Sequence, residues 1–193
     1  MSANFGELVL LLGDHHIPSR SVSIPEPFQR MLVPNKMQHV ICTGNIGSAE
    51  EYDRLKELVG SSSSVHCVAG EYDFINGVGE SAAGGAFPET KVIKLGQFRV
   101  GIIGGHQVVP HGDLSSLAMV RRRLNVDLLV CGWKRKEGVV EYEGESKQMS
   151  PISFEIVLGM LLFFCHVNFT LILTFNPIHN CARLMQGDTT FSL

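Results

Sequence analysis

The sequence predicts an α/β domain, and two observations lead to this fold class. Short apolar segments that stop near a glycine recur along the chain, which is typical of central strands covered on both faces. Segments with apolar residues at helical spacing alternate with them, as they do in α/β proteins. The length of 193 residues suits one compact hydrophobic core, so we predict a single domain over residues 1–193.

The first half of the chain gives three strands and a helix. Apolar runs predict strands at residues 8–12, 37–42 and 65–68, each followed within two residues by glycine. The segment after the second strand begins with Ser48, a good N-capping residue, and then carries apolar residues at helical spacing. Residues 77–85 are glycine-rich, and we interpret them as a flexible insertion because no strand feeds directly into them and no G-K-[ST] motif follows.

The second half continues the alternation. Residues 90–95 and 99–103 predict a hairpin of two strands, and residues 113–124 predict a helix. That helix ends in three arginines, where cations interact favourably with the helix dipole. Further strands are predicted at residues 126–131 and 139–142. In such a fold, ligands bind at the carboxyl ends of the strands.

Composition excludes several classes of partner and site. A formal net charge of -3 with 18% charged residues gives no basic field for nucleic acid. The five cysteines are scattered and form no C-x-x-C pair, so neither a disulfide framework nor a zinc site is indicated. A reducing compartment fits this pattern. Glu7 interrupts the approach to the first apolar run, so we expect no secretory leader.

Polar side chains gather at the predicted strand ends. They are Asp14, His16, Asn45, Glu71, Asp73 and His106. Carboxylate, amide and imidazole groups of this kind, converging from several strands, could hold one or two divalent ions that activate water. The alternative is that each is an ordinary polar loop residue, since loop ends are normally polar.

Five short motifs carry a family resemblance. The runs GDHHIP, CTGN, AGEYDF, GGHQVVPHGD and CGWKRK resemble, in order and spacing, the calcineurin-like metallophosphoesterases. Within that family they are most similar to the branch of small phosphoesterase-like retromer subunits. The resemblance covers about residues 7–144 and implies a four-layer α/β/β/α sandwich, incomplete or altered in its C-terminal sheet.

The resemblance also implies a degenerate metal site. Asp14, His16 and Asn45 match family ligands, whereas Glu71 stands where the branch usually has aspartate. The three later histidines are absent, since Gly104 replaces the first and the run from Gly132 to Lys136 replaces the G-H-T-H-K motif. Lysine and arginine in that run offer no lone pair at neutral pH. We therefore expect a vestigial site with no cofactor and no catalysis. Weak binding of Zn or Mn with residual phosphoesterase activity is the alternative.

The family branch suggests a function in binding. It implies a non-catalytic scaffold of a retromer-like complex for endosome-to-Golgi or plasma-membrane sorting, cytoplasmic and peripheral to the endosomal membrane. The expected partner is the large α-solenoid subunit of the vacuolar protein sorting-associated protein 35 type. The residues expected to contact it are Val108, Val109, Pro110, His111 and Trp133. The alternative is that Val108 and Val109 pack into the edge of their own domain.

Beyond about Gly144 the resemblance ends, and residues 145–193 form an atypical hydrophobic segment. Residues 152–175 are apolar over nearly the length of a membrane span. Glu155, His166 and Asn168 within the run would be costly in hydrocarbon, and residues 167–175 alternate with a strand period. We favour strands of the sandwich. A membrane anchor is one alternative, and translation of an unspliced intron or a shifted reading frame is another.

Overall fold

The fold of the chain is given by a computed structural model. It describes residues 7–20, 22–24, 29–30, 32–59, 64–73, 87–96, 98–111, 113–132, 138–141, 154–157, 171–176, 181–186 and 189–192. The elements within these ranges, in chain order, are β1 (Glu7–Leu12), β2 (His39–Cys42), α2 (Ala49–Val59), β3 (Val65–Cys67), β4 (Thr90–Leu95), β5 (Phe98–Ile103), α5 (Leu114–Leu124), β6 (Leu128–Cys131), β7 (Gly138–Glu141), β8 (Phe154–Val157), β9 (Leu171–Asn176), β10 (Cys181–Gln186) and β11 (Thr189–Ser192).

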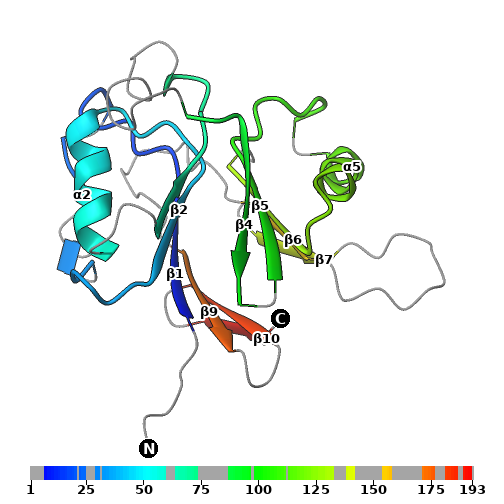
Figure 1. Cartoon of the computed structure of the whole chain (residues 1–193). Coiled ribbons are helices and arrows are strands. Elements are labelled where there is room, and N and C mark those ends of the chain that lie inside the picture. The colour runs from blue at the N-terminus through cyan, green and yellow to red at the C-terminus, as the bar shows by residue number, and fades with distance from the viewer. Residues whose placement is uncertain are drawn as a thin grey trace, which may run out of the picture.

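The strands form two sheets. The larger has six strands in the order β11-β10-β9-β1-β2-β3, and the smaller has five in the order β4-β5-β6-β8-β7. In the larger sheet, β1, β2 and β3 are parallel, while β9 runs antiparallel to β1. The two sheets face each other, with α2 outside the larger and α5 outside the smaller (Figure 1). This confirms the predicted four-layer α/β/β/α sandwich.

Strand alternation distributes the core over three interfaces. In β1, Val9 and Leu11 contribute to the cluster between the sheets, whereas Leu10 and Leu12 contribute to the cluster that holds α2. Both faces of β1 are therefore buried, which explains its uninterrupted apolar sequence. A third cluster, which includes Leu117 of α5 and Leu129 of β6, joins α5 to the smaller sheet.

The helix signals in the sequence are confirmed. Ser48 accepts a hydrogen bond on Oγ from the Glu51 N–H (3.2 Å), and Asp113 accepts one on Oδ2 from the Ser116 N–H (2.8 Å). At the other end of α5, Asn125 has φ 52° and closes the helix. Because the Val126 N–H bonds back to the Arg121 carbonyl (3.3 Å), strand β6 begins at Leu128 and not at residue 126.

The C-terminal segment supplies strands to both sheets. Strand β8 pairs with β6, and β9 pairs with β1, so both ends of the apolar stretch at residues 152–175 lie in the sandwich. This agrees with the strand interpretation, although residues 158–170 and the glycine-rich residues 77–85 lie outside the described residues. Within the part of the chain that the structure describes, no helix is both long and apolar enough to cross a membrane.

Candidate functional site

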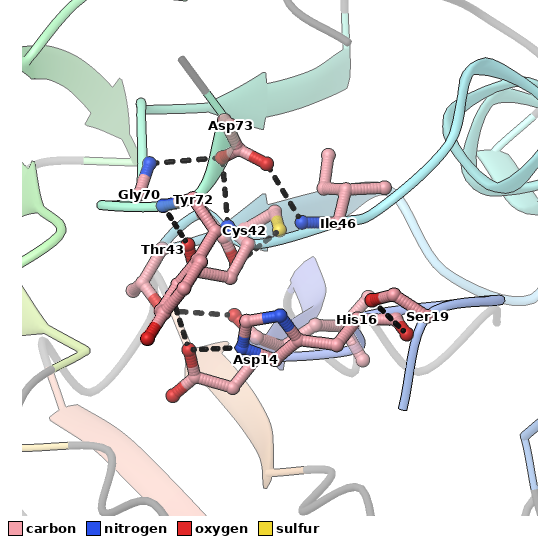
Figure 2. A network of polar contacts seen from close by, with 12 residues as sticks. Asp14, His16, Ser19, Cys42, Thr43, Ile46, Gly70, Tyr72 and Asp73 are labelled. Carbon is pink, nitrogen blue, oxygen red and sulfur yellow. Dashed lines mark hydrogen bonds and ion pairs between the residues drawn. The ribbon is translucent and has the colours of Figure 1, made fainter. Parts of the chain in front are cut away.

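The carboxyl ends of β1, β2 and β3 bring the predicted ligands together. The loop after β1 carries Asp14 and His16, the loop after β2 carries Asn45, and the turn after β3 carries Glu71 and Asp73. The first two loops are joined through their backbones: the Asp14 N–H donates to the Gly44 carbonyl (3.1 Å) and the His16 N–H to the Asn45 carbonyl (2.8 Å). Between these loops lie polar side chains that contact one another in a network (Figure 2).

Three residues of this site have a left-handed backbone. Asp14, His16 and Asn45 have φ values of 54°, 47° and 56°. Residues other than glycine seldom adopt this region, and Asn, Asp and His are enriched among those that do. Such residues persist where the surrounding contacts fix them, and they gather at functional sites. The residue types of the D-x-H and G-N motifs therefore serve the shape of the loops as well as their chemistry.

Asp73 holds two of the loops together. Its carboxylate accepts hydrogen bonds from three backbone N–H groups, those of Asn45 (2.7 Å), Gly70 (2.9 Å) and Ile46 (3.1 Å). The side chain is 4% exposed. Because both oxygens are engaged with the backbone, Asp73 acts as a structural bracket between the two loops. The sequence placed Asp73 at a strand end but gave no signal of this role.

The amide of Asn45 is oriented by its neighbours. The Tyr72 N–H, which can only donate, donates to Asn45 Oδ1 (2.9 Å). The amide nitrogen must then point the other way, and it donates to Asp14 Oδ1 (2.6 Å). Asn45 thus presents a donor, and not an acceptor, to the centre of the site. Hydrogen bonds to a carboxylate are stronger than those between neutral groups, so this contact ties the two loops together.

His16 and Tyr72 close the side of the network. His16 Nε2 lies 3.7 Å from Asp14 Oδ1, and this nitrogen is buried with no hydrogen-bond partner among the described residues. The Tyr72 ring meets the imidazole edge-on, with 5.2 Å between centroids, and the Arg20 guanidinium lies 4.9 Å from the centre of the tyrosine ring. The tyrosine ring therefore packs between the imidazole and the arginine.

The described residues do not fit a two-metal centre. Among them, no group of three or more His, Cys, Asp and Glu side chains could hold a metal ion. Glu71, which stands where the resemblance implies an aspartate, is exposed. A Cβ atom on Gly104 would stand 2.7 Å from the Ala69 carbonyl oxygen, and one on Gly132 would stand 2.5 Å from Thr43 Oγ1. At Gly104, where the resemblance implies the first of the missing histidines, a side chain would therefore collide with the backbone.

A second polar cluster lies behind the site. His15 Nδ1 lies 3.4 Å from Glu51 Oε1, with both side chains almost fully buried, and Arg54 donates to Glu51 Oε2 (3.2 Å). Burial raises the pKa of the Glu51 carboxyl, but the neighbouring His15 and Arg54 outweigh it, and the net shift is downward. The cluster connects the loop after β1 to the first turn of α2.

The residues predicted to contact a partner separate into two groups. Val108 is 7% exposed and packs in the cluster under α5, so for this residue the alternative of packing into its own domain holds. Val109 is 75% exposed, and Pro110 and His111 are also exposed. Trp133, together with Lys134 and Arg135, lies outside the described residues.

Comparison with known proteins gives consistent matches. The family model of the calcineurin-like phosphoesterase superfamily domain matches residues 8–147. The chain is 34% identical over 137 residues to vacuolar protein sorting-associated protein 29 of Schizosaccharomyces pombe, covering 71% of this chain and 67% of that protein.

Solved structures match over almost the whole chain. Vacuolar protein sorting 29 from Cryptosporidium parvum superposes with a TM-score of 0.76 at 29% identity, covering 98% of this chain and 96% of that one. Wild-type Vps29 from Entamoeba histolytica, complexed with Zn²⁺, gives a TM-score of 0.68 at 30% identity, covering 96% and 97%. The similarity of structure therefore continues through the C-terminal strands, which lie beyond the last of the sequence motifs.

Proposed function

Since the chain belongs to the calcineurin-like phosphoesterase superfamily and, within it, to the Vps29 family, we propose that it is a non-catalytic scaffold subunit of a retromer-like complex. The name of the fission-yeast relative assigns that protein to vacuolar protein sorting. Our proposal for this chain adds a mode of action. It docks on the large α-solenoid subunit and supports endosome-to-Golgi or plasma-membrane sorting, at the cytoplasmic face of the endosome and without entering the membrane.

The observation that carries this proposal is the exposure of Val109. It is 75% exposed, and the valine before it is buried. A solvent-facing turn has no need of an aliphatic side chain at its tip. Apolar side chains that stand free on a rigid support are typical of the central contacts of protein interfaces.

The support under Val109 is rigid. Gln107 bridges two segments, accepting from the Gly105 N–H (2.9 Å) and donating to the Glu89 carbonyl (3.0 Å). Val108 anchors the loop in the core, and the Asp113 N–H donates to the Pro110 carbonyl (3.2 Å) just before α5. A loop that is held before binding loses little conformational entropy when a partner docks. Val109, Pro110 and His111 are therefore presented as a preformed contact surface.

The polar network beside this loop supports a non-catalytic role. Asp14 is hydrogen-bonded by the Asn45 amide nitrogen, so the carboxylate that a phosphoesterase gives to its metals is occupied by a protein donor. We further propose that positive charge from Lys134 and Arg135 takes part in this replacement. Weak phosphoesterase activity with bound Zn or Mn is the second candidate. It is favoured only by the Zn²⁺ complex of the Entamoeba histolytica relative.

The test is a pull-down of the full chain with the C-terminal half of the α-solenoid subunit of the same organism. Val109→Asp should abolish binding, because it places a charge at the centre of the contact surface. Met119→Asp is the matched control, since Met119 is 64% exposed on α5. The control should bind as the unmodified chain does. If both variants bind as the unmodified chain does, or if both lose binding equally, the proposed surface is contradicted.

A further inference from the structure

Strand β4 leaves part of its outer face uncovered. Its residues Ile93 and Leu95 point into the core between the sheets, so the alternate residues Val92 and Lys94 point outward. Helix α5 packs on that outer face over β5 and β6, which provide the sheet residues of the third core cluster. Val92 is 43% exposed and Lys94 is also exposed, although α5 lies outside the same sheet (Figure 1). The outer face of β4, an edge strand, is therefore an open surface beside the helix.

Two cations stand opposite each other on this open face. Lys94 of β4 is the register partner of Arg99 of β5, and both side chains are exposed. Partners in adjacent strands point to the same face of a sheet, and like charges in such a pair destabilise it. The pairing of the two strands therefore gives no reason to place a lysine opposite an arginine here.

The end of α5 brings three arginines to the same region. A Cβ atom on Gly101 of β5 would stand 3.3 Å from Leu124 Cδ1, so the last turn of α5 lies against the strand two residues beyond Arg99. Arg99 is also joined to the residues that follow the helix. Its N–H donates to Asp127 Oδ2 (2.8 Å), and its carbonyl accepts from the Asp127 N–H (2.9 Å). The three arginines of the last turn therefore lie at the same end of the smaller sheet as Arg99.

These cations have no acidic partner in the described part of the chain. Among the described residues, no salt bridge involves Lys94, Arg99 or the arginines of α5. Arg121 follows the buried Leu117 by one helical turn, and its Nε is buried without a hydrogen-bond partner among those residues. A buried donor left unpaired costs free energy. The helix dipole favours cations at the end of α5, but its effect falls off within the last turn and does not explain Lys94 and Arg99.

We infer that this end of the smaller sheet is a basic docking surface for an extended, acidic segment of a partner protein. The surface is formed by Val92, Lys94, Arg99 and Arg121. Carboxylates of the segment supply the counter-ions that Lys94 and Arg99 lack, and an apolar side chain of the segment covers Val92. The basic docking surface lies at the C-terminal end of α5, whereas Val109 precedes its N-terminal end. The inference therefore does not depend on the proposed function.

The shape of the basic docking surface favours a polypeptide over a membrane. An α-helix with its side chains is about 10 Å across, so α5 rises by about that height beside the outer face of β4. A planar bilayer cannot pass the helix to reach Val92, whereas a single extended chain can lie in the step between them. Val92 and Lys94 are two positions apart on one face, and the side chains of an extended chain repeat at the same interval. The segment should therefore carry an apolar residue and an acid two positions apart.

The experiment measures fluorescence anisotropy of a labelled peptide with the repeat Val-Ser-Glu-Ser in the presence of the full chain. The unmodified chain should bind this peptide, and added salt should weaken the binding because it screens exposed charges. A peptide with lysine in place of glutamate should not bind. Lys94→Glu should weaken binding by about tenfold or more, since it replaces an attraction by a repulsion. Lys36→Glu makes the same charge change at an exposed site beside the end of α2, and should leave binding unchanged.

Thermal unfolding gives a second readout that separates binding from folding. Lys94→Glu should raise the melting temperature, because it places opposite charges across the strand pair. Weaker binding by a more stable chain is not expected of a lysine with a merely structural role. A lower melting temperature in Lys94→Glu would overturn the inference, and so would equal binding by the two lysine variants or no binding by the unmodified chain. Binding to vesicles of phosphatidylcholine and phosphatidylserine, but not to the peptide, would also overturn it.

Discussion

At the scale of single residues, two acids in one turn have opposite roles. Glu71 occupies the position of a family ligand and is exposed, whereas Asp73 two residues later is buried and accepts three backbone N–H groups. The AGEYDF motif alone points to Glu71 as the functional acid, because a motif records only positions along the chain. The three-dimensional contacts point to Asp73 instead.

Substitution of these two acids should separate the roles. Asp73→Ala leaves three buried N–H donors without an acceptor and should lower the free energy of unfolding by about 3 kcal/mol or more. Glu71→Ala should change it by less than about 0.5 kcal/mol, as is usual for exposed residues. Urea denaturation at pH 7 measures both. Similar losses in the two variants would refute the assignment of the bracket to Asp73.

The Asn45 amide predicts how the chain responds to metal. Zn²⁺ or Mn²⁺ should not raise the melting temperature of the unmodified chain, because Asn45 turns its nitrogen toward Asp14. Asn45→Asp places a second carboxylate there and removes the donor. That variant should be less stable in EDTA than the unmodified chain, since two adjacent carboxylates repel each other.

Divalent ions should then recover part of the stability that Asn45→Asp loses, because paired carboxylates attract hard cations. Thermal unfolding with EDTA, Zn²⁺ and Mn²⁺ in turn tests this. A rise in the melting temperature of the unmodified chain with either metal would mean that the Asn45 amide yields to the ion.

At the scale of secondary structure, the sequence was informative wherever the signal is local. Apolar runs defined the parallel strands, and Ser48 marked the start of α2 because capping acts within three residues. The limits of β6 were less certain, since the backbone conformation of Asn125 decides where the helix ends. Local chemistry predicts the elements well for this reason.

The roles of site residues were less predictable because they depend on contacts distant in sequence. The Asn45 side chain is oriented by Tyr72, 27 positions away, and bonds to Asp14, 31 positions away. Val108 and Val109 are the same residue type in neighbouring positions, yet one is buried and the other exposed. Only the packing of α5 on the smaller sheet distinguishes them.

At the scale of the whole molecule, the C-terminal segment is part of the sandwich. Strand β9 pairs with β1 along five residues, so the first strand lies between β2 and β9 in the interior of its sheet. β10 and β11 then extend the sheet to its edge. The C-terminal segment, which follows the family motifs, thus covers β1. The side chains of β1 contribute to both major core clusters.

Truncations should distinguish the two parts of this segment. Removal of residues 171–193 uncovers the edge of β1 and should give an insoluble chain with no cooperative unfolding transition, since exposed edges of buried strands aggregate. Removal of residues 189–193 takes away only the outer strand β11 and should leave a soluble, cooperative fold. Calorimetry of both variants tests this. A cooperative transition in the shorter variant would mean that β9 is dispensable.

The central place of β1 also bears on how the chain folds during its synthesis. Val9 lies opposite Leu173, 164 positions later, so this pairing has a high contact order. At translation rates of roughly 5–20 residues per second, the first strand waits between roughly 8 and 33 s for its partner to leave the ribosome. Through that interval one edge of an apolar strand is open, and a chaperone that covers it would decide the yield of folded protein.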